Sequence, residues 1–181
     1  DNPNTSAYGP KELAPEVKEA MSLKLLKKAF RWARAVNPSQ PLTAGPWRGD
    51  WSSDDKLGEQ DRFLFTHSDI ITFHCYGNVD DMKQRVKWVK RFNRPCLCTE
   101  YMARVTGSTF PNILPYLKEQ KVSAYNWGFV AGKTQTIYPW DSWRKKYTAE
   151  PPVWFHDIFR PDGTPYIPDE VALINKLTGK E

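Results

Sequence analysis

Short apolar segments alternate with amphipathic helices along most of this chain, and that alternation constrains its fold most strongly. The segment from Pro95 to Thr99 is too short for a helix and too continuously apolar for a strand with one exposed face. In the longer stretches, such as Glu16 to Val36, apolar residues recur at helical spacing with lysine and arginine between them. The pattern predicts an α/β fold in which crossover helices join the strands of a parallel sheet.

Four strands and five helices are expected along the chain. The predicted strands are 40–47, 69–77, 95–99 and 122–128, and the predicted helices are 16–36, 56–66, 80–93, 109–119 and 169–177. The 181 residues are enough for a single domain, 1–181, with a hydrophobic core. Four parallel strands are half of a (β/α)8 barrel of about 250 residues.

Glu100 stands where the predicted strand 95–99 ends. Sites in parallel sheets and barrels are built at the carboxyl ends of strands, so this carboxylate is a candidate site residue. Strict alternation of side chains places Cys96, Cys98 and Glu100 on one face. The alternative is a structural glutamate that pairs with Arg104 or Arg48 and carries out no chemistry.

Aromatic residues make up 14% of the chain and include eight tryptophans and eight tyrosines. Flat apolar rings with polar edges suit carbohydrate ligands, although a large aromatic core would give the same composition. The net charge of +5 comes from lysines and arginines spaced along helix faces, which is typical of a solvated surface and predicts no nucleic-acid partner. No apolar run reaches the length of a membrane span, so no membrane partner is expected.

The three cysteines do not form a disulfide framework, because their number is odd and Cys96 and Cys98 are same-face neighbours. A metal site made of His74, Cys75, Cys96 and Cys98 would not match any zinc-binding spacing. Buried free thiols, no metal and no cofactor are therefore expected.

Distinctive residues stand at the ends of all four predicted strands: Trp47, His74 with Tyr76, Glu100 and Trp127. In this order and at these separations, the set resembles the C-terminal half of a retaining glycoside hydrolase of the large (β/α)8-barrel clan that includes family 5 cellulases and mannanases. The resemblance covers essentially the whole chain and implies that it forms strands five to eight, a half barrel. It implies hydrolysis of a β-linked polysaccharide or oligosaccharide.

The resemblance also implies residue roles. Glu100 matches the catalytic nucleophile at the end of strand seven, and His74-Cys75-Tyr76 matches a His-x-Tyr pattern at the end of strand six. Trp127 matches the tryptophan that floors the sugar site, and His74, Tyr76 and Trp47 are further candidates for substrate binding. Tyr76 could donate a hydrogen bond that orients Glu100. The remaining loop tryptophans, Trp51, Trp140 and Trp143, could line outer sugar-binding sites or could simply pack within their loops. The closing pattern Trp154-Phe-His-Asp157 also resembles these enzymes.

One part of the family pattern is missing. The clan's acid/base is the glutamate of an Asn-Glu-Pro type motif after strand four, and no Asn-Glu pair precedes the first predicted helix. The resemblance implies that this residue lies just upstream of Asp1. Glu12, Glu16 and Glu19 are poor substitutes because they belong to a loop or the first helix. The chain alone is therefore expected to be inactive, and to pair with the N-terminal half of the barrel or a second copy of itself.

Two other functions are compatible with the sequence. A catalytically silent carbohydrate-binding protein could use the aromatic loops, but it would not need a carboxylate at position 100. A doubly wound domain binding a phosphate or another small molecule would need a glycine-rich turn after its first strand, and Ala44-Gly45-Pro46 is not such a turn.

Overall fold

The computed structural model describes residues 14–180. Within that range the helices and strands are α1 Pro15–Ala35, η2 Asp54–Lys56, α2 Glu59–His67, β1 Ile71–His74, α3 Val79–Lys90, β2 Cys96–Tyr101, η3 Arg104–Thr106, α4 Phe110–Glu119, β3 Ser123–Asn126, η4 Trp140–Trp143 and α5 Pro168–Thr178. None of the helices in this range is both long and apolar enough to cross a membrane.

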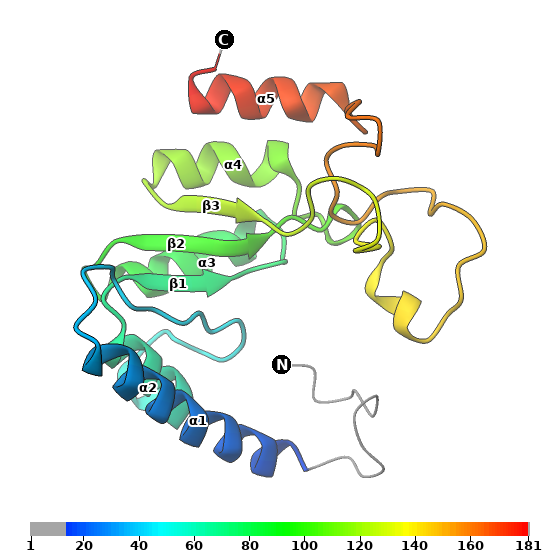
Figure 1. Ribbon diagram of the computed structural model, residues 1–181. Coiled ribbons are helices and arrows are strands. Elements are labelled where there is room, and N and C mark those ends of the chain that lie inside the picture. Colours follow the sequence, from blue (N-terminus) through cyan, green and yellow to red (C-terminus); the bar gives the residue numbers. More distant parts are fainter. Residues whose placement is uncertain (1–13, 181) are drawn as a thin grey trace.

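The three strands form a parallel sheet in the order β1-β2-β3. Helix α3 connects β1 to β2 and helix α4 connects β2 to β3 (Figure 1). The predicted α/β fold with parallel βα repeats is thus confirmed. Both crossover helices have N-terminal capping residues. Asn78 and Asp81 form a capping box at α3, and the Thr109 side chain accepts a hydrogen bond from the Asn112 N–H at α4.

The prediction of a strand at 40–47 was wrong, although the segment does lie along the free edge of β1. The Asp69 N–H donates to the Leu42 carbonyl at 2.7 Å, and the His74 N–H donates to the Pro46 carbonyl at 3.1 Å. Pro41 and Pro46 have no N–H to offer, so the segment cannot complete a ladder with β1. It remains extended and occupies the position of an edge strand.

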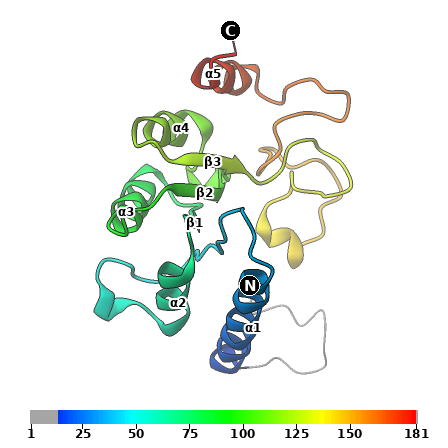
Figure 2. The same ribbon diagram turned by 60° about the vertical axis from the view of Figure 1, so that its left-hand side comes forward.

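One face of the sheet packs on helices, and the other face is exposed at β3, whereas on β1 the Thr72 side chain is buried there beside Thr43. Phe73 of β1 and Cys98 of β2 are fully buried in a core that also contains Met82 of α3 and Ile113 of α4. Figure 2 shows α2, α3 and α4 together on one side of the three strands. Tyr125 of β3 is 55% exposed, which is unusual for a large residue in the middle of a strand.

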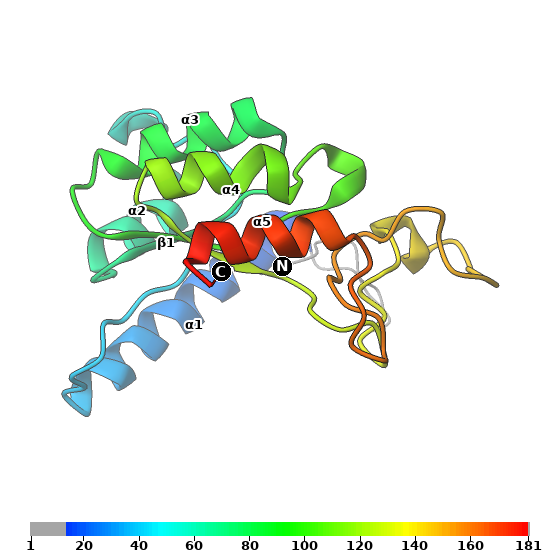
Figure 3. The same ribbon diagram turned by 90° about the horizontal axis from the view of Figure 1, so that it is seen from above.

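The long segment between β3 and α5 extends beyond the carboxyl ends of the strands (Figure 3). It is fastened there by Arg104, a buried side chain just after β2. The Arg104 guanidinium makes two hydrogen bonds to the Glu170 carboxylate, at 3.1 and 2.6 Å, and donates to the Trp154 and Asp157 carbonyls at 3.0 Å. One arginine thereby connects the end of β2 to α5 and to residues 154–157.

Candidate functional site

Glu100, near the end of β2, is the centre of a polar cluster at the carboxyl edge of the sheet. The Tyr76 hydroxyl donates a hydrogen bond of 2.9 Å to Oε2 of Glu100. Nδ1 of His74, the last residue of β1, lies 3.4 Å from the same oxygen. The His74 and Glu100 side chains are both about one quarter exposed, at 25% and 27%. The carboxylate is therefore held from one side and accessible from another.

The predicted face of Glu100 was wrong. Cys96 and Cys98 lie in the hydrophobic core, whereas Glu100 turns toward His74. The strand pairing explains the difference: Phe73 pairs with Cys98 but His74 pairs with Glu100, so Thr99 is an extra residue in β2. Such a bulge interrupts the alternation of side chains and redirects the residue that follows.

The protonation states of the two neighbours suit contact with a carboxylate. Burial raises the pKa of the Tyr76 hydroxyl well above its ordinary value, and the Glu100 charge raises it further, so Tyr76 keeps its proton for the hydrogen bond. Burial lowers the pKa of His74, and the nearby charge of Glu100 only partly opposes that effect. His74 is consequently a neutral imidazole at pH 7.

The backbone after Glu100 is held in an unusual conformation. Met102 is fully buried and has a φ of 66°, in the left-handed region that few side chains adopt. Its N–H donates to Oγ of Ser108 at 3.3 Å, and its carbonyl accepts from Nδ1 of His156 at 2.7 Å. These two contacts fix the direction of the chain as it leaves the carboxylate.

His156 is a site residue that the sequence reasoning missed. Its ring lies 5.4 Å from the Tyr76 ring, centroid to centroid, and its side chain is buried. Because a carbonyl can only accept, the contact with Met102 places the proton of the neutral imidazole on Nδ1. The only signal in the sequence was a histidine inside the closing pattern Trp154-Phe-His-Asp157.

Aromatic rings surround this cluster unevenly. Trp140 packs edge-on against Tyr76 with centroids 5.3 Å apart, and 43% of its surface is exposed. Trp127 directly follows β3 and is 52% exposed. Trp51, in contrast, is fully buried beneath the Arg85 guanidinium and has no face to offer a ligand. Trp143 is exposed on η4.

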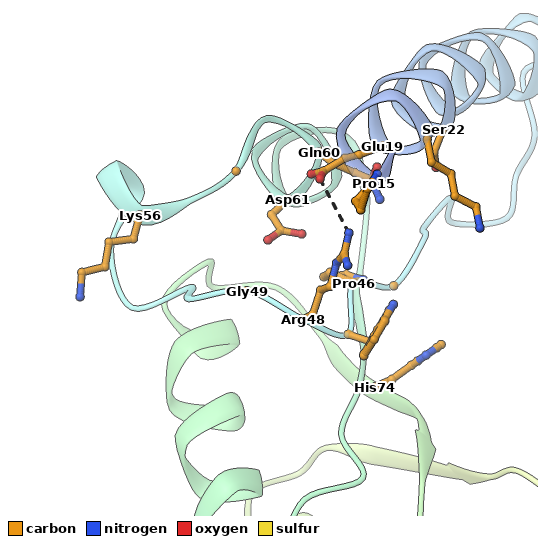
Figure 4. A pocket seen from close by; sticks show the side chains of 14 residues that line it. Pro15, Glu19, Ser22, Pro46, Arg48, Gly49, Lys56, Gln60, Asp61 and His74 are labelled. Carbon is orange, nitrogen blue, oxygen red and sulfur yellow. Dashed lines mark ion pairs between the residues drawn. The ribbon is translucent and has the colours of Figure 1, made fainter. Parts of the chain in front are cut away.

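A cleft of about 410 Å³ opens on the other side of His74. It lies between the first turns of α1 and α2 and the loop 45–49, and we call it the α1–α2 cleft. Trp47 and His74 are among the residues that line it. Figure 4 shows Arg48 pointing toward Glu19 of α1, with Asp61 of α2 on one side and His74 on the other.

The arginines proposed as structural partners of Glu100 bind other carboxylates. Arg104 pairs with Glu170, and Arg48 lies 3.7 Å from Glu19. Of the three upstream glutamates, Glu16 and Glu19 lie on α1, and Glu12 is outside the described residues. Glu19 lines the α1–α2 cleft rather than ending a strand.

Neither a metal centre nor a disulfide is found within residues 14–180. This range has no group of three or more His, Cys, Asp and Glu side chains arranged to hold a metal ion. Cys75, Cys96 and Cys98 are buried free thiols, and burial raises the pKa of each of them. They are therefore unreactive thiols rather than thiolates.

The arrangement offers an oriented carboxylate, a phenol that donates to it, a neutral imidazole and exposed indole faces. No protein-family model matches the chain, and a search of curated proteins found no match either.

Proposed function

We propose that this chain is the nucleophile-bearing half of a retaining glycoside hydrolase that cleaves β-linked polysaccharide or oligosaccharide. The observation that carries the proposal is the cluster of Tyr76, Glu100 and His74 at the carboxyl edge of the sheet. A nucleophilic carboxylate must be oriented, ionised and reachable, and this cluster meets the first and third needs directly.

The topology supports the assignment of the chain to strands five to eight of a (β/α)8 barrel. Three parallel strands follow one another in order, with crossover helices on one face. The extended segment 42–46 lies along β1 where a preceding strand would pair. Under this proposal 42–46 takes the place of strand five, and β1, β2 and β3 take the places of strands six, seven and eight.

Retention requires two carboxyl groups about 5–5.5 Å apart. An oxygen of Glu100 would attack the anomeric carbon while the second group protonates the departing glycosidic oxygen. Water would then attack the same carbon, giving its proton back to the second group and releasing Glu100. Tyr76 would hold Glu100 in line throughout, and the exposed faces of Trp47, Trp127 and Trp140 would carry sugar rings.

The second carboxyl group would come from a partner. The sheet face that is exposed at β3, with Tyr125, is the surface that a complementary half barrel, or a second copy of the chain, would cover. We therefore expect these 181 residues alone to be inactive on β-glycosides and to associate in sedimentation experiments. A monomeric and fully active preparation would rule out this part of the proposal.

Trapping the covalent intermediate tests the central role of Glu100. The assembled enzyme is treated with a slow 2-fluoro sugar, and the labelled peptide is located by mass spectrometry. The label should be on Glu100, and Glu100→Gln should abolish labelling while leaving sugar binding nearly intact. Glu119→Gln, on the surface of α4, is the matched control and should label normally. A label on another carboxylate, or near-normal turnover by Glu100→Gln, would refute the assignment.

The same experiment separates hydrolysis from the binding-only alternative. A protein that binds carbohydrate through its aromatic residues would retain sugar but would never form a glycosyl-enzyme. Ligand binding without any label in the assembled protein would favour that alternative.

A further inference from the structure

Tyr76, whose hydroxyl donates to Glu100, lies just beyond the backbone pairing of β1 with β2. The pairing ends with the bond from the Cys75 N–H to the Glu100 carbonyl, at 3.0 Å. Within residues 14–180, no later backbone hydrogen bond joins residues 76–78 to β2 or to the loop that follows it. The sheet therefore fixes the position of Cys75 but leaves the backbone of Tyr76 to be held by other contacts.

The hydroxyl of Thr106 supplies such a contact. Thr106 is the last residue of η3, the short turn after β2, and its Oγ1 donates to the Tyr76 carbonyl at 2.5 Å and to the Ala103 carbonyl at 2.8 Å. The same oxygen accepts from the Ser108 N–H at 3.4 Å, so the hydroxyl proton faces the two carbonyls. One side chain thus joins the segment that carries Tyr76 to the segment that follows Glu100.

The loop that carries Thr106 is a small closed unit that contacts the same turn at a second point. An antiparallel bridge between Ala103 and Ser108 closes the base of the loop. A Cβ added to Gly107 would lie 3.7 Å from Cβ of Asn78, the N-cap residue of α3. The loop therefore lies directly against residues 76–78, and its closed base holds Thr106 in place.

The position of the Tyr76 backbone matters because the phenol must reach the carboxylate. The hydrogen bond from Tyr76 to Glu100 is 2.9 Å long, and such bonds weaken steeply when the donor and acceptor move apart or lose alignment. Trp140 and His156 pack against the Tyr76 ring, whereas Thr106 holds the backbone from which the ring extends. The ring contacts and the backbone contact together direct the hydroxyl to the carboxylate.

From these contacts we infer that Thr106 is a positioning residue, whose hydroxyl holds the Tyr76 backbone where the phenol can donate to Glu100. The consequence for the reaction rests on the proposed function. Thr106 is exposed and acts through Tyr76 rather than on the sugar. Its loss should therefore lower kcat in the proposed hydrolase and leave KM unchanged.

A double-mutant cycle on the 181-residue chain tests the positioning without reference to any activity. Thr106→Val removes the hydroxyl and keeps a β-branched side chain, and Tyr76→Phe removes the phenol hydroxyl. Urea unfolding gives the folding equilibrium constant of each variant. Thr106→Val should lower this constant about two- to tenfold more in the parent than in Tyr76→Phe, where no phenol hydroxyl remains to be misplaced.

Two control variants distinguish positioning from a general loss of a hydroxyl. Thr178→Val removes a hydroxyl that also donates to two carbonyls, those of Ile174 at 2.8 Å and Asn175 at 3.2 Å, on α5. It should cost the same stability in the parent and in Tyr76→Phe. Thr106→Ser keeps the hydroxyl and should retain the coupling to Tyr76.

Kinetics of the proposed hydrolase test the consequence for the reaction. Thr106→Val should lower kcat about two- to tenfold, the value of one neutral hydrogen bond, at an unchanged KM. Thr106→Ser should restore most of the parent kcat. A rise in KM at constant kcat, or an unchanged kcat, would overturn the role of Thr106 in the reaction.

The outcomes separate this inference from the proposed function. Equal costs of Thr106→Val in the parent and in Tyr76→Phe would overturn the positioning, as would a Thr106→Ser variant that behaves like Thr106→Val. Labelling of Glu100 by the fluoro sugar without that coupling would overturn the inference alone. Coupling without any label on Glu100 in the assembled protein would overturn the hydrolase and support the positioning of Tyr76 by Thr106.

Discussion

The Met102 carbonyl accepts a hydrogen bond of 2.7 Å from Nδ1 of His156, across 54 residues of sequence. This bond connects Met102, two residues after Glu100, to the segment 154–157. Arg104 donates hydrogen bonds to the carbonyls at both ends of that segment. The orientation of the carboxylate therefore depends on residues near the C-terminus as well as on its own strand.

The free energy of unfolding should depend on pH through the protonation of His156. Burial lowers its pKa below the ordinary value of 6.5, so the unfolded chain binds more protons in that range. The stabilising contribution of neutral His156 should be complete above about pH 6.5 and decline as the pH falls through its folded-state pKa. His74 titrates in the same direction, so the informative quantity is the difference between the parent and His156→Gln. In urea unfolding at pH 7.5 and pH 5.0, His156→Gln should lose less stability on acidification than the parent does. An identical loss in the two proteins would show that His156 does not cause the pH dependence.

Tyr76→Phe should lower the kcat of the proposed hydrolase with little effect on folding. The substitution removes the hydrogen bond to Glu100 and keeps the ring that packs on Trp140 and His156. A hydrogen bond to a charged group contributes about 1.5–3 kcal/mol, which corresponds to about 10- to 150-fold in rate. Tyr147→Phe is the control, because it also removes a tyrosine hydroxyl that donates to a carboxylate. That hydrogen bond, to Asp141 at 2.7 Å, lies away from the sheet. Equal effects of the two variants on kcat would contradict a role for Tyr76 at the site.

Arg104→Met should destabilise the protein by about 3–5 kcal/mol, because it leaves the Glu170 charge buried without a partner. The two side chains are only 4% and 6% exposed. Arg34→Met breaks the ion pair between Arg34 and Asp69. These side chains are 43% and 41% exposed, so water screens the pair. Chemical denaturation should therefore show a far smaller loss for Arg34→Met. Similar losses for both variants would mean that the Arg104 network is not a principal anchor.

Gly128→Ala should destabilise the protein by about 1–3 kcal/mol, because the backbone there is in the left-handed region. The φ of Gly128 is 93°, and an added Cβ would lie 2.9 Å from Cβ of His156. Gly58→Ala is the control, since its Cβ would meet nothing within 4 Å and its φ is −60°. Differential scanning calorimetry should show a lower Tm for Gly128→Ala only, and an unchanged Tm would contradict the close packing of Gly128 on His156.

The repeating α/β order could be predicted from the sequence because local patterns determine it. Helical periodicity and short apolar runs located β1, β2 and β3 correctly. The segment 40–47 has the same apolar character, but its two prolines prevent a complete ladder, and only the positions of its neighbours reveal the contacts that remain. His74, Tyr76 and Glu100 were expected to lie together, and they do.

Features that depend on long-range packing could not be predicted in this way. The bulge at Thr99 has no glycine or proline to mark it, so alternation placed Glu100 on the wrong face. The contact of His156 with Met102 and the pairing of Arg104 with Glu170 connect residues more than fifty positions apart. Neither contact leaves a periodic signal in the sequence.

The extra residue at Thr99 makes β2 more sensitive to changes in length than to changes in side chain. Deleting one residue between Cys98 and Glu100 would remove the bulge and move Glu100 and Tyr101 one position closer to Cys98, which would change the directions of their side chains. Replacing Thr99 with another β-branched residue would keep the register and the direction of Glu100. Among relatives with a glutamate at this position, the spacing between the buried cysteine and the glutamate should therefore tolerate substitutions but no insertions or deletions.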